Sequence, residues 1–315
     1  MDASQFRSTA VVGAGAVGCY FGAMLARAGQ PVTLVGRPAH VQAVHERGLQ
    51  LQRAGAPAET VRVQASTDLA AVRGAGLVLF CVKSPDTEAT ARELAPLLDD
   101  DALVLSLQNG VDNADTISRH VRQAVAPAVV YVAAAMAGPG VVAHFGRGDL
   151  VIGSRPGAEV GAARLQAVVD LFAGAQVPVK LSPDVTGELW QKLLANCAWN
   201  ALSAIAQRTY GEVAAQPETL EVRRAVVREA VAVAAAQGRR IDFDAAMATI
   251  ERLAPAMPRT YSSTAQDLAR GKPSEIDHLN GTLVRLGAQL GVPTPVNQAL
   301  LALVKLAESA RKSAG

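Results

Sequence analysis

Lys192, Asn196 and Asn200 are the residues whose types and spacing most directly suggest chemistry. They are four residues apart within the mostly apolar segment 188–200, so they share one face of a predicted helix. Burying them without partners would cost roughly 1–3 kcal/mol for each amide and more for the ammonium, which indicates that a polar group meets them. An ammonium can stabilise a developing alkoxide and then protonate it.

The same stripe also has an ordinary structural interpretation. Glu188 lies four residues before Lys192 and could form a surface ion pair with it, and the asparagines could bond to neighbouring helices. Only six of the 30 cationic residues are lysines, however. A plain surface cation in this chain would more often be an arginine, so composition favours a functional Lys192.

A glycine-rich run near the N-terminus could hold a dinucleotide. Gly13-Ala14-Gly15-Ala16-Val17-Gly18 follows an apolar strand and opens a helix, the context that makes the G-x-G-x-x-G pattern informative. Gly13 would permit the tight turn, Gly15 the approach of a pyrophosphate and Gly18 close packing of helix on sheet. The phosphates would lie on the free N–H groups at the helix start. A glycine-rich turn without a ligand is the alternative.

The end of the next strand favours one dinucleotide over the other. Val32–Val35 is followed by Gly36-Arg37, with no carboxylate to accept hydrogen bonds from a free ribose 2′-hydroxyl. A guanidinium there can hold a 2′-phosphate by paired hydrogen bonds. We therefore predict NADP(H) rather than NAD(H), although Arg37 could also be a solvated loop residue.

Two later strand ends add polar groups, Lys83 after one apolar run and Asn109 after another. Ligands of open α/β sheets bind beyond the carboxyl ends of the strands. Asn109-Gly110 is ordinarily a hairpin signal, but the following segment 111–121 reads as helix, which favours a cofactor-facing loop. Lys83 taken alone could be merely solvated.

These candidates require an α/β half to position some of them and a helical half to position the others. Apolar runs alternate with amphipathic stretches up to about residue 181, as in a parallel sheet covered by helices. Beyond Ser182-Pro183-Asp184 almost everything reads as helix. We predict an α/β Rossmann-like NADP-binding domain over 1–182, followed by an all-α substrate-binding domain over 183–315. The predicted strands are 10–12, 32–35, 77–82, 103–107, a pair within 127–154, and 177–181; the predicted helices are 16–28, 86–98, 112–122, 158–173, 185–207, 218–237, 243–253, 275–290 and 296–312.

Two uncharged runs imitate membrane signals. Thr9–Ala26 resembles the apolar core of a secretory leader, but its glycines fall where a nucleotide-binding turn needs them. Ala124–Ala143 is long enough to span a bilayer, but Gly138-Pro139-Gly140 divides it into two segments of strand length. We therefore predict a nucleotide turn and a strand pair, and no membrane partner.

Composition narrows the function classes. Thirty Lys and Arg against 28 Asp and Glu give a net charge of +2, too little for a field that attracts nucleic acid. Three cysteines, Cys19, Cys81 and Cys197, lie in apolar runs, as buried reduced thiols of a cytoplasmic protein would. No ligand spacing suggests a metal, and no G-x-S-x-G elbow suggests a serine hydrolase.

A second polar group lies in the helical half, in Ser262–Asp267 and the segment Lys272–Gly281. Ser274 and Asp277 could form a capping box at the start of a helix. Glu275 would be comfortable in that first turn through the helix dipole alone. Spacing in the sequence does not bring this group to Lys192.

Taken in order along the chain, these motifs resemble those of the ketopantoate reductases, also called 2-dehydropantoate 2-reductases. The resemblance covers nearly the whole chain. It rests on the glycine run at 13–18, Lys83, Asn109-Gly110, the segment Glu188–Cys197 that looks like the family's ELWxKLxxNC signature, Asn200, Ser262-Ser263, Gln266-Asp267, Glu275-Ile276-Asp277 and Asn280-Gly281. Tyr210-Gly211-Glu212 departs from the Asn-Gly-Glu run of some members.

The resemblance implies NADPH-dependent reduction of a 2-oxo acid in pantothenate and coenzyme A biosynthesis. Lys192 matches the family's proton donor, Glu275 matches a glutamate at the reacting centre, and Ala135 matches a residue whose backbone meets the nicotinamide. Matches to residues that contact substrate or cofactor are Asn109, Asn196, Asn200 and Ser263.

Other interpretations stay open at this point. A related reductase could act on another 2-oxo acid, a 2-hydroxy acid dehydrogenase could work in the oxidative direction, and a sensor could bind NADP without catalysis. A sensor has no need of the cation in the stripe. The alanine-rich helices of the second half are compatible with a homodimer.

Overall fold

The computed structural model describes residues 6–312, and their side chains as far as residue 310. The chain divides into two compact units, Met1–Leu189 and Trp190–Gly315. In the described range every strand belongs to the first unit, and the second is built from helices. The predicted fold class is thus confirmed. The predicted boundary at residue 182 precedes α6 (Val185–Ala206), whereas the division between the units falls inside that helix.

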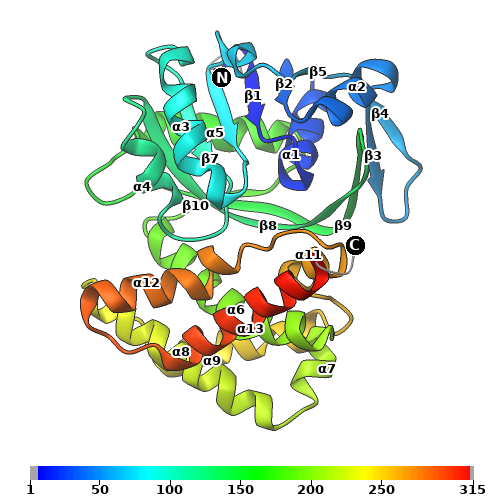
Figure 1. The fold of residues 1–315 in the computed structure, drawn as a ribbon. Coiled ribbons are helices and arrows are strands. Elements are labelled where there is room, and N and C mark those ends of the chain that lie inside the picture. The colour runs from blue at the N-terminus through cyan, green and yellow to red at the C-terminus, as the bar shows by residue number, and fades with distance from the viewer. Residues whose placement is uncertain (1–5, 313–315) are drawn as a thin grey trace. The chain divides into compact units, whose positions relative to one another are not determined.

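Ten strands of the described residues form one mixed sheet in the order β4-β3-β9-β8-β7-β6-β1-β2-β5, with β10 beside β9 (Figure 1). The strands from β5 through β2, β1, β6 and β7 to β8 are parallel, as a Rossmann-like sheet requires. The strand β9 runs antiparallel to β8. Their bounds are β1 Thr9–Val12, β2 Val32–Val35, β3 Leu49–Arg53, β4 Glu59–Val61, β5 Gln64–Ser66, β6 Leu77–Phe80, β7 Leu103–Ser106, β8 Ala124–Gly138, β9 Val141–Ile152 and β10 Val179–Leu181.

Helices cover the sheet in the first unit and form the whole framework of the second (Figure 1). In the first unit these are α1 Ala16–Arg27, α2 Pro38–Arg47, α3 Thr87–Leu94, α4 Asn113–Ser118 and α5 Ala162–Gly174, with 3₁₀ turns η2 Leu69–Val72, η3 Ser84–Asp86 and η4 Ala95–Leu97. After α6 come α7 Tyr210–Ala214, α8 Glu218–Ala236, α9 Phe243–Glu251, α10 Leu253–Ala256, α11 Ser263–Ala269, η5 Ile276–His278, α12 Asn280–Leu290 and α13 Pro295–Lys312.

The central strands bury both of their faces. Successive side chains of a strand point to opposite sides, so Val11 and Leu79 pack in one apolar cluster with side chains of α1 and α5, while Val12 and Phe80 pack in another with those of α3 and α4. Burial on both faces explains why these strands are continuous apolar runs in the sequence. It also explains why they could be predicted within a residue or two.

The run 124–143 forms two strands, as predicted. The strands β8 and β9 pair antiparallel about the turn at Gly138-Pro139-Gly140, and Gly140 has φ +72°. In the described chain no helix combines the length and apolarity needed to span a bilayer.

The segment 38–66 holds elements that the sequence did not predict. It forms α2 and the short strands β3, β4 and β5. In β3 only Leu49 and Leu51 are buried, and they alternate with more exposed glutamines. Two alternations are too few to separate a strand from a loop by pattern.

The predicted helix 275–290 is interrupted. Ile276–His278 is a 3₁₀ turn, and Leu279, with φ −109° and ψ −103°, separates it from α12. The predicted capping box is wrong, because Ser274 Oγ accepts from the Ile276 N–H at 3.3 Å and not from that of Asp277. The Ser274 N–H and hydroxyl both donate to Glu308 Oε1, at 2.9 and 2.6 Å, and Asp277 accepts from Lys305 Nζ at 2.7 Å. Both partners lie on α13, which the sequence could not place beside this turn.

The three cysteines are free thiols. Cys19 on α1 and Cys197 on α6 are fully buried, as predicted, whereas Cys81 after β6 is only partly buried. Burial raises the pKa of Cys19 to about 12 and also raises the pKa of Cys197. Such thiols are held in the unreactive protonated form.

Candidate active site

The glycine run forms the turn from β1 into α1, and two of its glycines are required by packing. Gly13 has φ +100°, and a Cβ atom there would lie 2.6 Å from the backbone nitrogen of Val82. A Cβ atom on Gly18 would lie 2.5 Å from the carbonyl oxygen of Gly13. These are the tight turn and the close helix packing that the sequence pattern predicted.

Gly15 is different, because its missing side chain leaves open space. It is the N-cap residue of α1, no side chain caps that helix, and a Cβ atom on Gly15 would meet nothing within 4 Å. The first N–H groups of a helix have no partners within it and carry its positive dipole end. The glycine turn therefore fits the diphosphate of a dinucleotide.

Arg37 lies next to this turn. The backbone N–H groups of Gly13 and Ala14 donate to the carbonyl oxygen of Val35 at 3.1 and 3.0 Å, which ties the turn to the end of β2. A Cβ atom on Gly36 would lie 2.7 Å from that of Ala14, so this contact also needs glycine. Arg37 follows at once, exposed, at the start of α2. Arg37 thus stands beside the glycine turn, just beyond the carboxyl end of β2.

Lys83 and Asn109 sit on loops that a buried polar network holds together. Gln108 Nε2 donates to Thr87 Oγ1 at 2.7 Å and to the Val82 carbonyl oxygen at 3.1 Å, while Asn113 Nδ2 donates to Ser84 Oγ at 3.2 Å and to the Asn109 carbonyl oxygen. This network was not predicted from the sequence, where its only signal was polar residues among apolar ones. Because β7 and β8 are parallel, Asn109-Gly110 is not a hairpin, as predicted.

A single helix, α6, carries the whole predicted stripe. Asp184 caps its start by accepting from the Gly187 N–H at 2.9 Å. Lys192 and Asn196 are partly buried and Asn200 is 2% exposed, one turn apart on the same face. Glu188 Oε1 lies 3.6 Å from Lys180 Nζ.

The last residue of the stripe meets two neighbouring helices. Asn200 Nδ2 donates to Ser263 Oγ of α11 at 3.4 Å, and the Tyr210 hydroxyl of α7 donates to Asn200 Oδ1 at 3.4 Å. Ser262 caps α11, and its hydroxyl also donates to the Asn200 carbonyl oxygen at 3.2 Å. The structure thus brings together Asn200 and Ser263, and adds Tyr210, which the sequence marked only as a departure.

Glu275 is partly buried on the irregular segment before α12. Asn280, five residues later, is fully buried; its Nδ2 donates to the Cys197 carbonyl oxygen of α6 at 3.2 Å and to Asn297 Oδ1 at 2.9 Å. The segment that contains Glu275 is therefore anchored to α6 next to Asn196. Asn280 has a structural role that spacing alone could not reveal.

Ala135 lies in β8, buried, opposite Ala143 of β9 and between two irregularities of the register. Such irregularities re-aim the backbone groups around them. Within the described residues no cluster of three or more His, Cys, Asp or Glu side chains could hold a metal ion.

Comparison with known proteins identifies the family. Residues 9–157 match the family described as ketopantoate reductase PanE/ApbA, and residues 184–308 match its C-terminal part. The chain belongs to the ketopantoate reductase family. This confirms the oxidoreductase class and the NADP(H) cofactor that the sequence predicted.

Named relatives of the family cover almost the whole chain. The chain is 32% identical to the 2-dehydropantoate 2-reductase of Archaeoglobus fulgidus and 35% identical to that of Halobacterium salinarum, in each case over 95% of this chain and 97% or 98% of the relative. Among solved structures it is similar to a PanE/ApbA family ketopantoate reductase from Ralstonia eutropha, with 53% identity, a TM-score of 0.89, and coverage of 97% and 99% of the two chains.

A relative with a different name has an equally similar fold. The ternary structure of a D-mandelate dehydrogenase with NADH and anilino(oxo)acetate matches with a TM-score of 0.89 at 26% identity, over 97% of this chain and 99% of the other. A similar fold therefore also occurs in a protein that is named for a different substrate and was crystallised with NADH.

Proposed function

We propose that this protein reduces 2-dehydropantoate to pantoate with NADPH, the step that supplies pantoate for pantothenate and coenzyme A synthesis. The observation that carries the proposal is the polar face of α6, on which Lys192, Asn196 and Asn200 follow one another at single turns and the last of them bonds to Ser263. A protein that only sensed NADP(H) would not need a cation on that face.

Lys192 is the proton donor in this proposal. When bound, NADPH supplies the hydride that reduces the ketone carbon. The ammonium of Lys192 stabilises the negative charge that develops on the ketone oxygen and then transfers a proton from Nζ to it. A helix holds this side chain more rigidly than a loop would, which keeps the charge aimed at one position.

The other polar residues bind and orient the substrate. The amides of Asn196 and Asn200 donate to its carbonyl or carboxylate oxygens, and Ser263 and Asn109 add hydroxyl and amide groups. Glu275 belongs to the reacting centre, close in the chain to Asn280, which is bonded to α6.

The cofactor residues are those of the first unit, with Glu275 added from the second. The run Gly13–Gly18 binds the diphosphate and Arg37 the 2′-phosphate. Lys83, Asn109 and the backbone of Ala135 bind the remainder of the dinucleotide, with Ala135 at its nicotinamide end. We assign residues 1–182 to the NADP-binding domain and residues 183–315 to the substrate-binding domain. We further propose that the enzyme is cytoplasmic, that it acts on a small molecule, and that it forms a homodimer.

A second candidate is a 2-hydroxy acid dehydrogenase for an aromatic substrate. It is supported by the similarity to a D-mandelate dehydrogenase bound to NADH and an aromatic 2-oxo acid derivative. Arg37 favours the first candidate, because a guanidinium at the end of β2 suits NADPH.

The test follows the absorbance of NADPH and of NADH with 2-dehydropantoate, an aromatic 2-oxo acid and a straight-chain 2-oxo acid. We expect the highest kcat/KM with NADPH and 2-dehydropantoate. Preference for the aromatic acid would establish the second candidate, and no turnover of any 2-oxo acid would contradict both.

A further inference from the structure

The segment Tyr210-Gly211-Glu212 contains two residues whose roles are purely structural. A Cβ atom on Gly211 would lie 2.7 Å from the carbonyl oxygen of Pro258, so the close approach of these backbones requires glycine. Glu212 completes a capping box at the start of α7, where its carboxylate accepts from the Thr209 N–H at 2.9 Å. Neither contact needs a tyrosine at position 210.

Tyr210 itself is held from several sides. It is 7% exposed, its N–H donates to the Thr260 carbonyl oxygen at 2.9 Å, and its ring packs edge-on against Trp199, with ring centres 5.7 Å apart. Aromatic pairs in this geometry are mutually stabilising. The phenol ring is therefore fixed in one place relative to α6.

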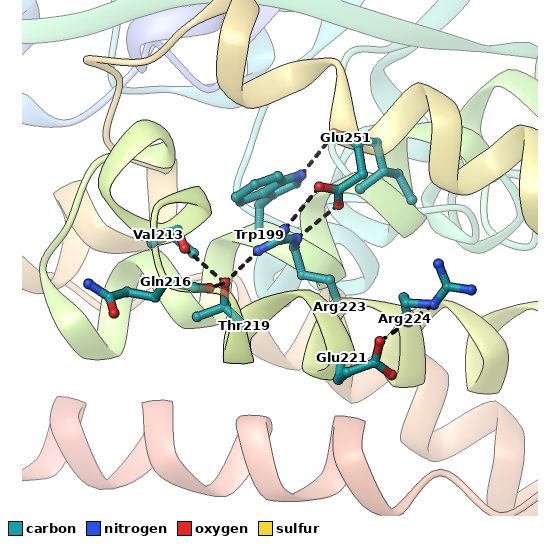
Figure 2. A network of polar contacts seen from close by, with 9 residues as sticks. Trp199, Val213, Gln216, Thr219, Glu221, Arg223, Arg224 and Glu251 are labelled. Atoms are coloured by element: carbon teal, nitrogen blue, oxygen red, sulfur yellow. Dashed lines mark hydrogen bonds and ion pairs between the residues drawn. The ribbon is translucent and has the colours of Figure 1, made fainter.

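Trp199 is in turn held by the ion pair between the buried Arg223 and the partly exposed Glu251, which Figure 2 shows. Its indole Nε1 donates to the Ile250 carbonyl oxygen at 3.0 Å, and the guanidinium of Arg223 lies 4.1 Å from its ring centre. Nε and Nη2 of that guanidinium donate to Oε1 and Oε2 of the Glu251 carboxylate, each at 2.9 Å. Arg223 therefore packs on the Trp199 ring, and Trp199 in turn packs against the ring that carries the Tyr210 hydroxyl.

The Tyr210 hydroxyl contacts the side-chain amide of Asn200. It donates to Oδ1 at 3.4 Å, while Nδ2 of the same amide donates to Ser263 Oγ. Hydrogen bonds at catalytic sites are often long before the ligand is bound. Burial raises the pKa of Tyr210 to about 12, so the phenol keeps its proton and remains a donor at neutral pH.

We propose that Tyr210 is a positioning residue that sets the orientation of the Asn200 amide, so that Asn200 offers N–H groups, and not its carbonyl oxygen, to an anionic 2-oxo acid. This inference rests on the proposed function. With Oδ1 bound to the phenol, the donors of Asn200 lie on the side of Ser263. If the amide were rotated by 180°, Asn200 Oδ1 would face the carboxylate or the developing alkoxide of the substrate. The repulsion between these oxygens would weaken binding.

The test is the variant Tyr210→Phe, which removes one hydroxyl and keeps the ring against Trp199. We expect kcat/KM for the 2-oxo acid to fall about 3- to 10-fold, in keeping with the loss of one hydrogen bond, mainly through a higher KM. The KM for NADPH should not change. Because KM does not depend on how much of the enzyme is folded, a smaller folded fraction alone would not produce this difference.

A double-mutant cycle with Asn200→Ala makes the test specific. If Tyr210 acts through Asn200, then Tyr210→Phe should change kcat/KM less than 2-fold in the Asn200→Ala background. Equal effects in the two backgrounds, or no effect of Tyr210→Phe on the wild type, would overturn the inference while leaving the proposed function intact. If Asn200→Ala alone left 2-oxo acid reduction unchanged, the role proposed for Asn200 and this inference would both be wrong.

Thr219→Val is the matched control in the same unit. The Thr219 hydroxyl lies 2.8 Å from the carbonyl oxygens of Val213 and Gln216, which share its single proton, and it accepts from Arg223, so its loss should lower the melting temperature. In the part of the chain that the structure describes, Thr219 makes no hydrogen bond to Asn200 or Tyr210, and Arg223 keeps its two bonds to Glu251 without it, so we expect both KM values to stay as in the wild type. A comparable rise in the 2-oxo acid KM for this control would show that the effect at Tyr210 is structural.

Discussion

Lys192 carries most of the chemistry that we propose. We expect Lys192→Ala to lower kcat about 10²-fold or more, because general acid catalysis is worth roughly 10² to 10⁴. The Kd for NADPH, measured by fluorescence titration, should remain within about 2-fold. Lys180→Ala, which removes an exposed lysine of the first unit, is the control and should keep wild-type turnover. Turnover by Lys192→Ala near that of the wild type would eliminate this residue as the acid.

Arg37 should decide the choice of cofactor. A charge-assisted hydrogen bond to a phosphate is worth about 1.5–3 kcal/mol, so Arg37→Ser is expected to raise the Kd for NADPH about 10- to 100-fold. The Kd for NADH should hardly change, since NADH has no 2′-phosphate. Titration of both cofactors checks this, and equal weakening of both would mean that Arg37 supports only the loop.

At the level of single residues, the sequence indicated Lys192 through the scarcity of lysine and the glycine turn through its context. It did not predict where Tyr210 lies. The contact of Tyr210 with Asn200 joins residues on two different helices, and no spacing pattern reports such a contact.

Among the elements, the β1–α1 turn allows the effect of a substitution on stability to be separated from its effect on NADPH binding. Gly13→Ala would place a Cβ atom 2.6 Å from a backbone atom at φ +100°, and we expect a clear loss of stability in urea unfolding. Gly15→Ala meets nothing within 4 Å, and Gly15 has φ −87°, which alanine adopts freely. It should keep the melting temperature yet bind NADPH at least about 10-fold more weakly, because the added methyl lies where the phosphates approach. Unchanged NADPH affinity in Gly15→Ala would place the diphosphate elsewhere.

The element α2 supplies a pH dependence through His40. Its Nδ1 accepts from the Gly140 N–H at 3.0 Å, its Nε2 lies 3.4 Å from Cys19 Sγ, and burial lowers its pKa below 6.5. As the pH falls, His40 of the unfolded chain is therefore protonated near pH 6.5, whereas His40 of the folded chain is protonated only at a lower pH. By linkage, the free energy of unfolding should decrease as the pH falls below about 6.5.

His40→Asn offers an acceptor to Gly140 without a titrating ring. Urea unfolding at pH 7.5 and pH 5.5 should show a smaller decrease in this variant than in the wild type. An identical decrease in both would assign the pH dependence to other groups.

Helices and strands could be predicted from the sequence where their pattern of apolar residues extended over many positions. The helix α6 and the strands buried on both faces were placed within a few residues. The edge strands β3 to β5 and the break at Leu279 were not, because short exposed strands have weak patterns. The break also depends on contacts of Ser274 and Asp277 with α13, and sequence does not report such distant partners.

At the scale of the whole molecule, composition and the change of texture after Ser182-Pro183-Asp184 were enough to predict an α/β part and a helical part. The residue at which the two units divide was harder to predict. The chain passes from one unit to the other within the uninterrupted helix α6, and a helix gives no sequence signal at such a point.

The two fully buried cysteines offer a measure of how the molecule unfolds. Cys19 lies in the first unit and Cys197 in the second, and a thiol reagent reaches a buried, protonated thiol only when its surroundings open. We expect both to be labelled at least about 10²-fold more slowly in buffer than in urea, followed by mass spectrometry of their peptides. A cofactor present at about 100 times its Kd stabilises the native state by about 2.7 kcal/mol, so NADPH should slow the labelling of Cys19 by up to about 100-fold. If Cys197 is slowed equally, the two units open as one cooperative body; if it is not, each opens by itself.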